Sequence, residues 1–258
     1  MDNLTVIIPI EVLDTEEKKQ LFVNAMSSVD DSDILVVGPK KAIESLSDID
    51  LSKFKFTTEI NTGKNVSYAA QVMFALKHVK TKYFSVLEFD DVFSDIWFKN
   101  LKQYIDVDVN DTFAFLPLTE IVDYESKATF AYANEAVWAS SFSDELGCYD
   151  MQCLEDYFNF NTSGGVFKTE DFLALGGLKP SMKIVYWYEF LFRALYKGKR
   201  IFVIPKVGYY HTVNRPNSVT KIYTETVTAK EADWWIDLAK KEYFFPQDRK
   251  KTYTEDEE

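Results

Sequence analysis

Several residue types are scarce in this chain, and each scarcity excludes a class of protein. Only 2 cysteines, Cys148 and Cys153, occur among 258 residues, which excludes a disulfide framework, and they do not form a metal-binding CxxC pair. The 9 glycines are scattered, so no glycine-rich phosphate loop follows the first predicted strand. The 29 basic residues are outnumbered by 41 acidic ones, and the net charge of -12 disfavours non-specific nucleic-acid binding.

Long apolar runs are also missing. The N-terminal MDNLTVIIPI has a short apolar run and no basic flank, so the sequence predicts neither a signal peptide nor a membrane span. Together with the sparse cysteines, this favours a cytoplasmic protein. Apolar and aromatic side chains are abundant, at 47% and 16% of the residues, which is enough for a sizeable core.

The first hundred residues alternate between short apolar runs and helical patterns. Helical spacing predicts helices that begin near Asp14, Val66 and Ser94, with a capping box formed by Asp14 and Glu17 and a cap at Ser94. Strands that alternate with helices in this way indicate a parallel sheet with right-handed crossovers. The apolar runs that predict strands are residues 4–9, 33–37, 54–58 and 83–88.

The second half is less regular, above all between residues 112 and 161. Residues 113–118 (FAFLPL) and 201–205 (IFVIP) predict strands, and residues 186–196 predict an amphipathic helix. A short helix is expected to begin at Thr169 and to end at the pair Gly176–Gly177. Thr228 and Glu231 form a capping box for a final helix that carries Trp234 and Trp235, followed by an acidic tail.

Three carboxylates follow the fourth predicted strand in KYFSVLEFDDVF (residues 82–93): Glu88, Asp90 and Asp91. In an open parallel sheet, ligands bind beyond the carboxyl ends of the strands. A divalent cation such as Mg²⁺ or Mn²⁺ would neutralise the repulsion between these acids and would use their oxygens as ligands. The alternative is a solvated turn that acids merely flank.

The order of these segments resembles family 2 glycosyltransferases of the GT-A fold, over about Leu4 to Thr220. In the first half the resemblance rests on TVIIP, DILVV, the NTG turn and SVLEFDD, where the family has an acidic motif of the D-x-D-D type (the DXD motif). In the second half it rests on NTSGGVFKTEDFLALGGL (161–178), YWYEFLFRALYKGKRIFVIP (186–205) and GYYHTVNRPNSVT (208–220).

The resemblance implies an α/β protein with a Rossmann-like GT-A fold: a mixed, mainly parallel central sheet flanked by helices, with a C-terminal helix. Residues 1–106 would form the nucleotide-sugar-binding half and residues 107–220 the acceptor-binding half of one domain. Residues 221–258 would form the C-terminal helix and the acidic tail.

The implied activity is a metal-dependent, inverting hexosyl or pentosyl transfer from a nucleotide-diphosphate sugar to an acceptor hydroxyl. UDP-sugars are the default donors, although Gly38 and Pro39 stand where the family often has base-binding Asp residues. The acceptor stays open between a glycan, a small molecule and a modified nucleobase. The expected ligands of Mn²⁺ or Mg²⁺ are Asp91, Asp90 and His211. The expected donor-binding residues are Pro9, Glu11, Asn61, Lys64, Glu88 and Asp90.

An inverting transfer needs a base within hydrogen-bond reach of the acceptor hydroxyl. The family usually supplies it from a Glu-Asp pair, but Tyr186 and Trp187 occupy the corresponding places here. Glu189 and Asp171 are the candidates, with Glu155 and Asp156 as further ones. Their alternative roles are a surface acid on an amphipathic helix for Glu189 and a helix N-terminal charge for Asp171.

Rival functions keep the same fold. The missing Glu-Asp pair fits a non-catalytic sugar- or nucleotide-binding protein, and nucleotidyl transfer is disfavoured because the glycine-rich loop is absent. A nucleic-acid acceptor would need a basic track from Lys197, Lys199, Arg200, Lys206 and Arg215. Aromatic residues that could stack on sugars or bases, but are more often core, are Tyr132, Trp138, Tyr149, Trp187 and Tyr188.

Overall fold

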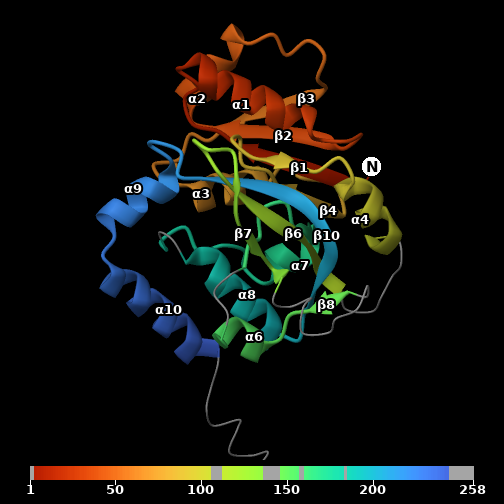
Figure 1. The fold of residues 1–258 in the computed structure, drawn as a ribbon, viewed down its shortest axis with the longest axis vertical. Helices are drawn as coiled ribbons and strands as arrows, with labels where there is room; N and C mark the ends of the chain where they lie inside the picture. The colour runs from red at the N-terminus through yellow and green to blue at the C-terminus, as the bar shows by residue number, and fades with distance from the viewer. Residues whose placement is uncertain (1–2, 106–111, 136–145, 157–159, 183–184, 244–258) are drawn as a thin grey trace, which may run out of the picture.

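A curled, mixed ten-stranded sheet lies at the centre of the molecule and is flanked by helices (Figure 1). The computed structural model describes residues 3–105, 112–135, 146–156, 160–182 and 185–243. The main strand order is β3-β2-β1-β4-β9-β6-β10-β5, with β7 paired to β6 and β8 paired to β10. This architecture confirms the predicted mixed, mainly parallel sheet flanked by helices.

The first half of the chain forms the parallel part of the sheet. Its first two strands are buried runs of mostly β-branched and aliphatic residues, which is the pattern of strands covered on both faces. The strands are β1 (Leu4–Pro9), β2 (Asp33–Gly38), β3 (Phe56–Ile60) and β4 (Tyr83–Val86). The connecting helices are α1 (Glu16–Ser27), α2 (Lys40–Glu44), the 3₁₀ helix η1 (Ser45–Asp48), α3 (Tyr68–Ala75) and α4 (Trp97–Ile105).

The second half inserts antiparallel pairs beside β4. Strand β9 (Val166–Lys168) lies between β4 and β6 (Thr112–Asp123) and is antiparallel to both, whereas β6 and β10 (Arg200–Val213) run parallel. The short β5 (Val92–Phe93) pairs antiparallel with β10. The remaining elements are β7 (Thr129–Ala133), β8 (Gly147–Cys148), α6 (Met151–Asp156), α7 (Thr169–Ala174), α8 (Tyr186–Tyr196), α9 (Val219–Thr226) and α10 (Ala229–Tyr243).

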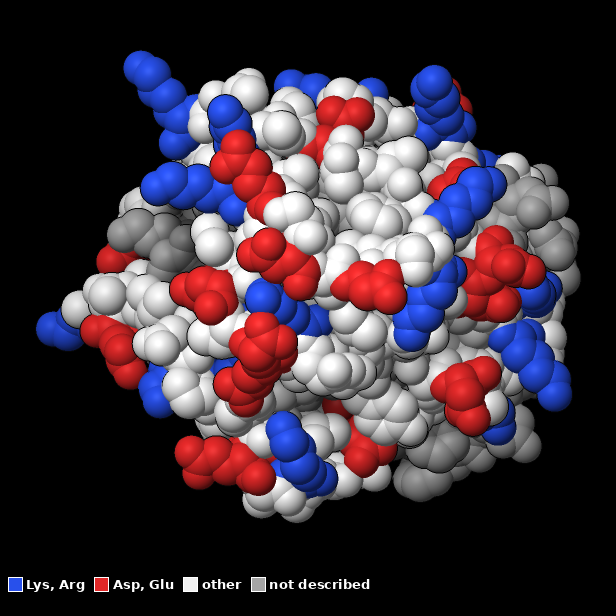
Figure 2. Space-filling model, turned by 90° about the horizontal axis from the view of Figure 1, so that it is seen from above, with Lys and Arg blue, Asp and Glu red and all other residues white. Residues whose placement is uncertain are grey.

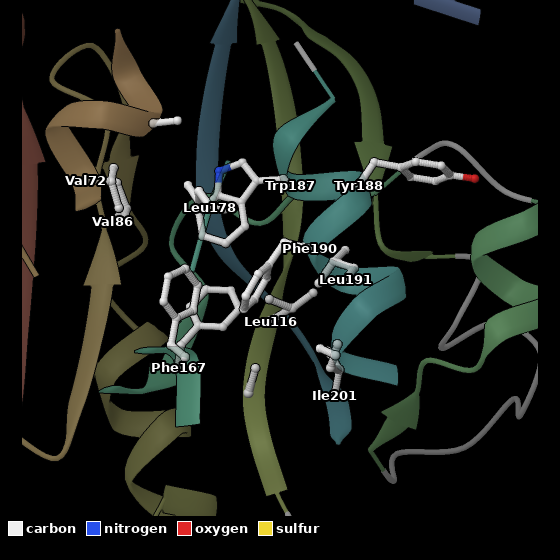
Figure 3. Close-up of a cluster of buried hydrophobic side chains, with 14 of the residues drawn as sticks. Val72, Val86, Leu116, Phe167, Leu178, Trp187, Tyr188, Phe190, Leu191 and Ile201 are labelled. Atoms are coloured by element: carbon white, nitrogen blue, oxygen red, sulfur yellow. The ribbon is translucent and has the colours of Figure 1, made fainter. Parts of the chain in front are cut away.

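Side-chain alternation along the strands builds one core on each face of the sheet. In β1, Val6 and Ile8 join the cluster that packs under α1 and α4, whereas Ile7 joins the cluster that packs under α3 and α8. The second cluster is rich in aromatic rings, and Trp187 of α8 stacks on Phe167 of β9 with ring centroids 5.3 Å apart (Figure 3). Helix α10 runs alongside α8, at the end of the molecule away from α1 and α2 (Figure 1).

The helix ends depart from the predicted caps in two places. Thr15, rather than Asp14, is the N-cap of α1, because its hydroxyl accepts a hydrogen bond from the Lys18 amide, while Asp14 forms an ion pair with the Lys18 side chain. The Ser94 hydroxyl donates to the carbonyl of Val207 in β10, so it ties the start of α4 to the sheet. Helix α8 spans the predicted residues 186–196.

Charged side chains of both signs are interspersed over the face seen from above (Figure 2). Within the described part of the chain, no helix has the length and apolar character needed to cross a membrane. Trp138 and the acidic tail after residue 243 lie outside the described residues. The division of the chain at residues 106 and 220 stays a prediction.

Candidate active site

The segment after β4 carries the predicted carboxylates to the edge of β10. Strand β5 pairs with β10 so that Phe93 lies opposite Tyr209 and Val92 opposite Tyr210. One step further in this antiparallel register, Asp91 meets His211.

The Asp91 side chain is only 1% exposed. Its Oδ2 lies 2.8 Å from Nδ1 of His211, and its Oδ1 accepts a hydrogen bond of 2.7 Å from the Thr212 amide. Both oxygens of this buried carboxylate are therefore held by β10.

Glu88 is held by β10 and by the segment that precedes β9. The Ser163 hydroxyl donates to Oε1 of Glu88 at 2.7 Å, and the Glu88 amide donates to the hydroxyl of Tyr209 at 3.1 Å. Ser163 reaches Glu88 because the next residue, Gly164, packs directly on the Tyr209 ring: a Cβ there would lie 2.3 Å from ring carbon Cδ2. Gly164 also has a φ of +74°, which only glycine adopts without strain. Ser163 followed by Gly164 is thus a local requirement of the site.

Glu88, Asp91 and His211 fit a divalent cation. One ligand atom from each lies within 4.8 Å of the other two. Two carboxylate oxygens and one imidazole nitrogen are a donor set that suits divalent ions such as Mn²⁺, and the residual repulsion between the acids favours such an ion. The structure thus brings together Asp91 and His211, both predicted as metal ligands, with Glu88, which was predicted to bind the donor and is one of the three acids expected to offer oxygens to a cation.

The crowded charges change the pKa values of the cluster. Burial and the charge of Asp91 raise the pKa of Glu88 to about 7, against the opposing effect of His211. Burial lowers the pKa of His211, but the carboxylates of Asp91, Glu88 and Asp90 outweigh it and raise that pKa to about 10. Without a cation, His211 is therefore protonated at neutral pH and supplies the positive charge that the acids require.

Asp90, the third predicted metal ligand, is not in this group of three and pairs with an arginine. Nε of Arg215 lies 2.6 Å from Oδ2 of Asp90, and Nη1 lies 3.5 Å from Oε1 of Glu11. The Arg215 guanidinium also lies 5.0 Å from the centroid of the Phe89 ring. Burial and the charge of Asp91 raise the pKa of Asp90, whereas Arg215 lowers it. The sequence analysis considered Arg215 only for a basic track, because no pattern near Arg215 or Asp90 marks the two residues as partners.

Two cavities meet at the cluster of Glu88, Asp91 and His211. The larger has a volume of about 1240 Å³, and the smaller has a volume of about 330 Å³; Glu88 and His211 line both. Five predicted donor-binding residues line the larger cavity: Pro9, Glu11, Lys64, Glu88 and Asp90. The smaller cavity is lined by Phe160, Asn161, Thr162, Ser163, Val185, Trp187, Tyr188 and Ile236 besides the two shared residues.

Asn61, the sixth predicted donor-binding residue, shapes the turn that carries Lys64. Its Oδ1 accepts a hydrogen bond of 2.9 Å from the Gly63 amide, and its Nδ2 donates to the carbonyl of Asn65 at 3.3 Å. Asn61 itself is 6% exposed. Its side chain therefore orders residues 61–65, and Lys64 and Asn65 of this turn line the larger cavity.

The two predicted bases lie in ion pairs and are not among the residues that line these two cavities. Glu189 is 2% exposed. Its carboxylate pairs with Nε and Nη2 of Arg193 at 3.0 and 2.8 Å and with Nζ of Lys179 at 2.8 Å. Arg193 also donates to the carbonyls of Leu175 and Gly177. Helix α8 starts at Tyr186, so Glu189 is an acid of its first turn.

Asp171, in the first turn of α7, pairs with Lys199 at 2.7 Å. Glu155 is in α6, and its carbonyl accepts a hydrogen bond from Lys240 of α10; Asp156 is the last residue of α6. That one of these acids takes the proton from the acceptor stays a prediction.

Comparison with solved structures identifies the fold. The structure of S. aureus TarS residues 1–349 in complex with UDP-GlcNAc matches 84% of this chain with a TM-score of 0.61 and 13% sequence identity. The structure of GalNAc-T7 with UDP, GalNAc and Mn²⁺ matches 81% of the chain with a TM-score of 0.58 and 12% identity. No protein-family model and no curated protein sequence matches the chain. The chain has a GT-A-like fold, as in nucleotide-sugar transferases.

The matched regions cover only part of these neighbours. The chain spans 60% of the TarS chain and 44% of the GalNAc-T7 chain. At identities this low the likeness establishes the fold, and the chemistry of this chain must come from its own residues.

Proposed function

We propose that this protein is a metal-dependent, inverting glycosyltransferase that moves a sugar from a UDP-sugar to an acceptor hydroxyl. The observation that carries the proposal is the cluster of Glu88, Asp91 and His211, whose ligand atoms lie within 4.8 Å of one another where the two cavities meet. The neighbours with UDP or UDP-GlcNAc, one of them with Mn²⁺, support it by fold.

Glu88, Asp91 and His211 would hold Mn²⁺ or Mg²⁺, which supplies charge stabilisation to a diphosphate as it leaves. The larger cavity would bind the donor, because its lining includes three cations, Lys64, Arg215 and Lys221, that suit a diphosphate. Pro9 and Glu11, at the end of β1, and the turn that Asn61 orders would contact the nucleoside.

The transfer breaks the bond between the anomeric carbon and the diphosphate oxygen, and UDP departs with the electron pair. The acceptor oxygen forms the new bond from the opposite face and gives up its proton to a base. Arg215 is placed to interact with the developing negative charge, since it lines the larger cavity next to Asp90. Glu189 and Asp171 remain the predicted bases, although both are held in ion pairs.

These ion pairs favour a second candidate function, a protein that binds a sugar nucleotide without turning it over. One experiment separates the two. The purified protein is incubated with a panel of UDP-sugars and Mn²⁺ or EDTA, and both the melting temperature and the release of UDP are measured. Mn²⁺-dependent UDP release supports the transferase. A ligand-induced rise in melting temperature without any UDP release supports the binding protein.

Asp91→Asn is the test variant for this assay, and Asp95→Asn is its matched control, because Asp95 is exposed and four residues along the same segment. Loss of both the Mn²⁺ effect and UDP release in the first variant alone would assign the chemistry to the cluster. Equal behaviour of the two variants would contradict the proposed function.

A further inference from the structure

The two cavities differ in the chemistry of their walls. Lys64, Arg215 and Lys221 line the larger one alongside acidic residues, whereas no lysine or arginine is among the described residues that line the smaller one. The charged residues of the smaller cavity are Glu88 and His211, and His211 is already paired with Asp91. An anionic group in the smaller cavity would therefore face Glu88 with no described lysine or arginine to pair with, which makes its binding less favourable than that of a neutral group.

Aromatic and aliphatic side chains form much of the smaller cavity. Tyr188 stacks on Phe160 with ring centroids 5.5 Å apart, and its hydroxyl donates to the carbonyl of Leu154 at 2.7 Å. Trp187 is fixed by its stacking on Phe167. Val185 and Ile236 complete the apolar part of the lining. These rings are held by packing, so they offer fixed apolar faces to a ligand at a low cost in side-chain entropy.

Small polar groups line the rest of the smaller cavity. Residues 161–163 form a turn in which the Asn161 side chain accepts a hydrogen bond of 2.7 Å from the Ser163 amide. The Ser163 hydroxyl in turn donates to Glu88. A lining that combines neutral hydrogen-bonding groups with apolar faces matches a sugar, which has hydroxyls around its rim and C–H groups on its faces.

This inference rests on the proposed function. We propose that the smaller cavity binds the acceptor, and that the acceptor is an uncharged sugar ring with one hydroxyl directed at Glu88 and His211. The cavity volume of about 330 Å³ is at the lower end of the range for ligand pockets, roughly 300–1,000 Å³, so it suits one ring rather than a long segment of polymer. The donor does not need this space, because the larger cavity of about 1240 Å³ can hold a whole sugar nucleotide.

The test compares matched neutral and anionic acceptors. The donor is a UDP-sugar that the protein hydrolyses in the absence of an acceptor. UDP release from this donor is measured without an acceptor and with methyl glycosides of common hexoses, pentoses and N-acetylhexosamines. It is measured again with the 6-phosphates of the same hexoses. We expect at least one neutral sugar to raise UDP release above the rate in water. We expect its 6-phosphate to raise it about tenfold less, because no described lysine or arginine lines the cavity to pair with the phosphate.

Ile236→Trp, which fills the smaller cavity from α10, tests the location. Leu238→Trp is the matched control, since Leu238 is on the same helix, is 40% exposed and is not among the residues that line either cavity. We expect the ratio of acceptor-dependent to acceptor-independent UDP release to fall about tenfold in Ile236→Trp. The same ratio should be retained in Leu238→Trp.

Three results would overturn the inference. The first is hydrolysis of the donor with no stimulation by any neutral sugar, or with stronger stimulation by a phosphorylated one. The second is equal ratios in the two tryptophan variants. The third is a raised donor KM for Ile236→Trp in the absence of acceptor, which would place the donor's own sugar in the smaller cavity. If no UDP-sugar is bound or hydrolysed at all, the proposed function itself fails, and this inference fails with it.

Discussion

Asp91 and His211 are 120 positions apart in the sequence, yet Nδ1 of the histidine lies 2.8 Å from Oδ2 of the aspartate. The contact follows from the pairing of β5 with β10, which places the chain after β4 against the far end of the last strand. Because burial of an unpaired carboxylate is costly, this histidine stabilises the acid in the absence of a cation. In the proposed function, the same two residues then hold the metal ion.

The first prediction concerns Asp91→Asn. The neutral amide cannot form an ion pair with a charged His211, and the change removes one of the negative charges that a cation needs. We expect the free energy of unfolding to fall by about 1–3 kcal/mol, as is typical when a hydrogen bond to a charged group is lost. We also expect the rise of melting temperature with Mn²⁺ to disappear. Urea unfolding and thermal unfolding with and without Mn²⁺ measure the two effects, and an intact Mn²⁺ response would contradict the assignment.

The second prediction is that Mn²⁺ affinity rises with pH. In the absence of a cation, the pKa of Glu88 is about 7 and that of His211 is about 10. Both groups bind protons more tightly than their ordinary values would allow, so a cation must displace these protons in order to bind. Between pH 6 and 8 we expect the Kd for Mn²⁺ to fall by about tenfold or more per pH unit.

Isothermal titration calorimetry in two buffers with different ionisation enthalpies measures this proton release directly. The released protons should number close to two below pH 7, where both groups are protonated, and close to one between pH 7 and 10. The same binding enthalpy in both buffers, together with a pH-independent Kd, would show that the cation does not use these residues.

The third prediction concerns Arg215, which contacts Asp90 and Glu11 from inside the larger cavity. Arg215→Lys keeps the charge but loses the planar fork that reaches two oxygens at once. We expect about a tenfold weaker affinity for UDP in the presence of Mn²⁺, by the loss of one charge-assisted hydrogen bond. The control is Lys40→Met, which removes an exposed cation paired with Glu44. Equal UDP affinity in the two variants, measured by calorimetry, would remove Arg215 from the donor site.

The parts of the fold that could be predicted are those marked by a pattern within a short stretch of sequence. Helix α8 has the predicted bounds because apolar residues recur at helical spacing and Gly198 follows its end. Strands β1 and β2 are uninterrupted apolar runs. The predicted caps of α1 and α4 were wrong, because the side chains of Asp14 and Ser94 have other partners: Lys18 for Asp14 and the Val207 carbonyl for Ser94. A side chain with two available partners cannot be assigned from the spacing of its own helix.

The site was predictable only where the family resemblance supplied the long-range order. It associated His211 with the acids after β4, and the structure brings Asp91, His211 and Glu88 together. The Arg215–Asp90 pair joins residues 125 positions apart and has no pattern in either segment. Glu189 is different, because its partner Arg193 is four residues on, and this i, i+4 spacing is a readable signal for an ion pair on a helix.

The fourth prediction concerns Glu189→Gln. Because the Glu189–Arg193 pair is buried and Arg193 also supports the turn at Gly177, breaking it should lower the free energy of unfolding by about 3–5 kcal/mol. The kcat of the folded protein, measured well below the melting temperature, then decides the sequence-based prediction. A large fall in kcat at unchanged donor affinity would support Glu189 as the base. A stability loss with retained kcat would leave it as the residue that anchors α8 to the turn after α7.

The last prediction concerns Asn134, a buried asparagine in the left-handed conformation with φ of 69° and 0% exposure. Its Nδ2 donates to the carbonyls of Pro117 and Asn161 at 2.7 and 2.9 Å. Its Oδ1 accepts from the Tyr149 hydroxyl at 2.7 Å and from the Asn161 amide at 2.9 Å. Asn134 thus fixes the turn that presents Ser163 to Glu88.

Asn134→Ala would leave several buried groups without partners and would keep a strained φ, so we expect the free energy of unfolding to fall by about 3 kcal/mol or more. Tyr149→Phe removes only one of the four hydrogen bonds and should cost about 1 kcal/mol. Urea unfolding of both variants provides the comparison, and the Kd for Mn²⁺ of Asn134→Ala at low urea should be weaker, because Ser163 no longer orients Glu88. A similar small loss of stability in both variants would contradict this role, since it would mean that the turn at residues 161–163 is held by other contacts.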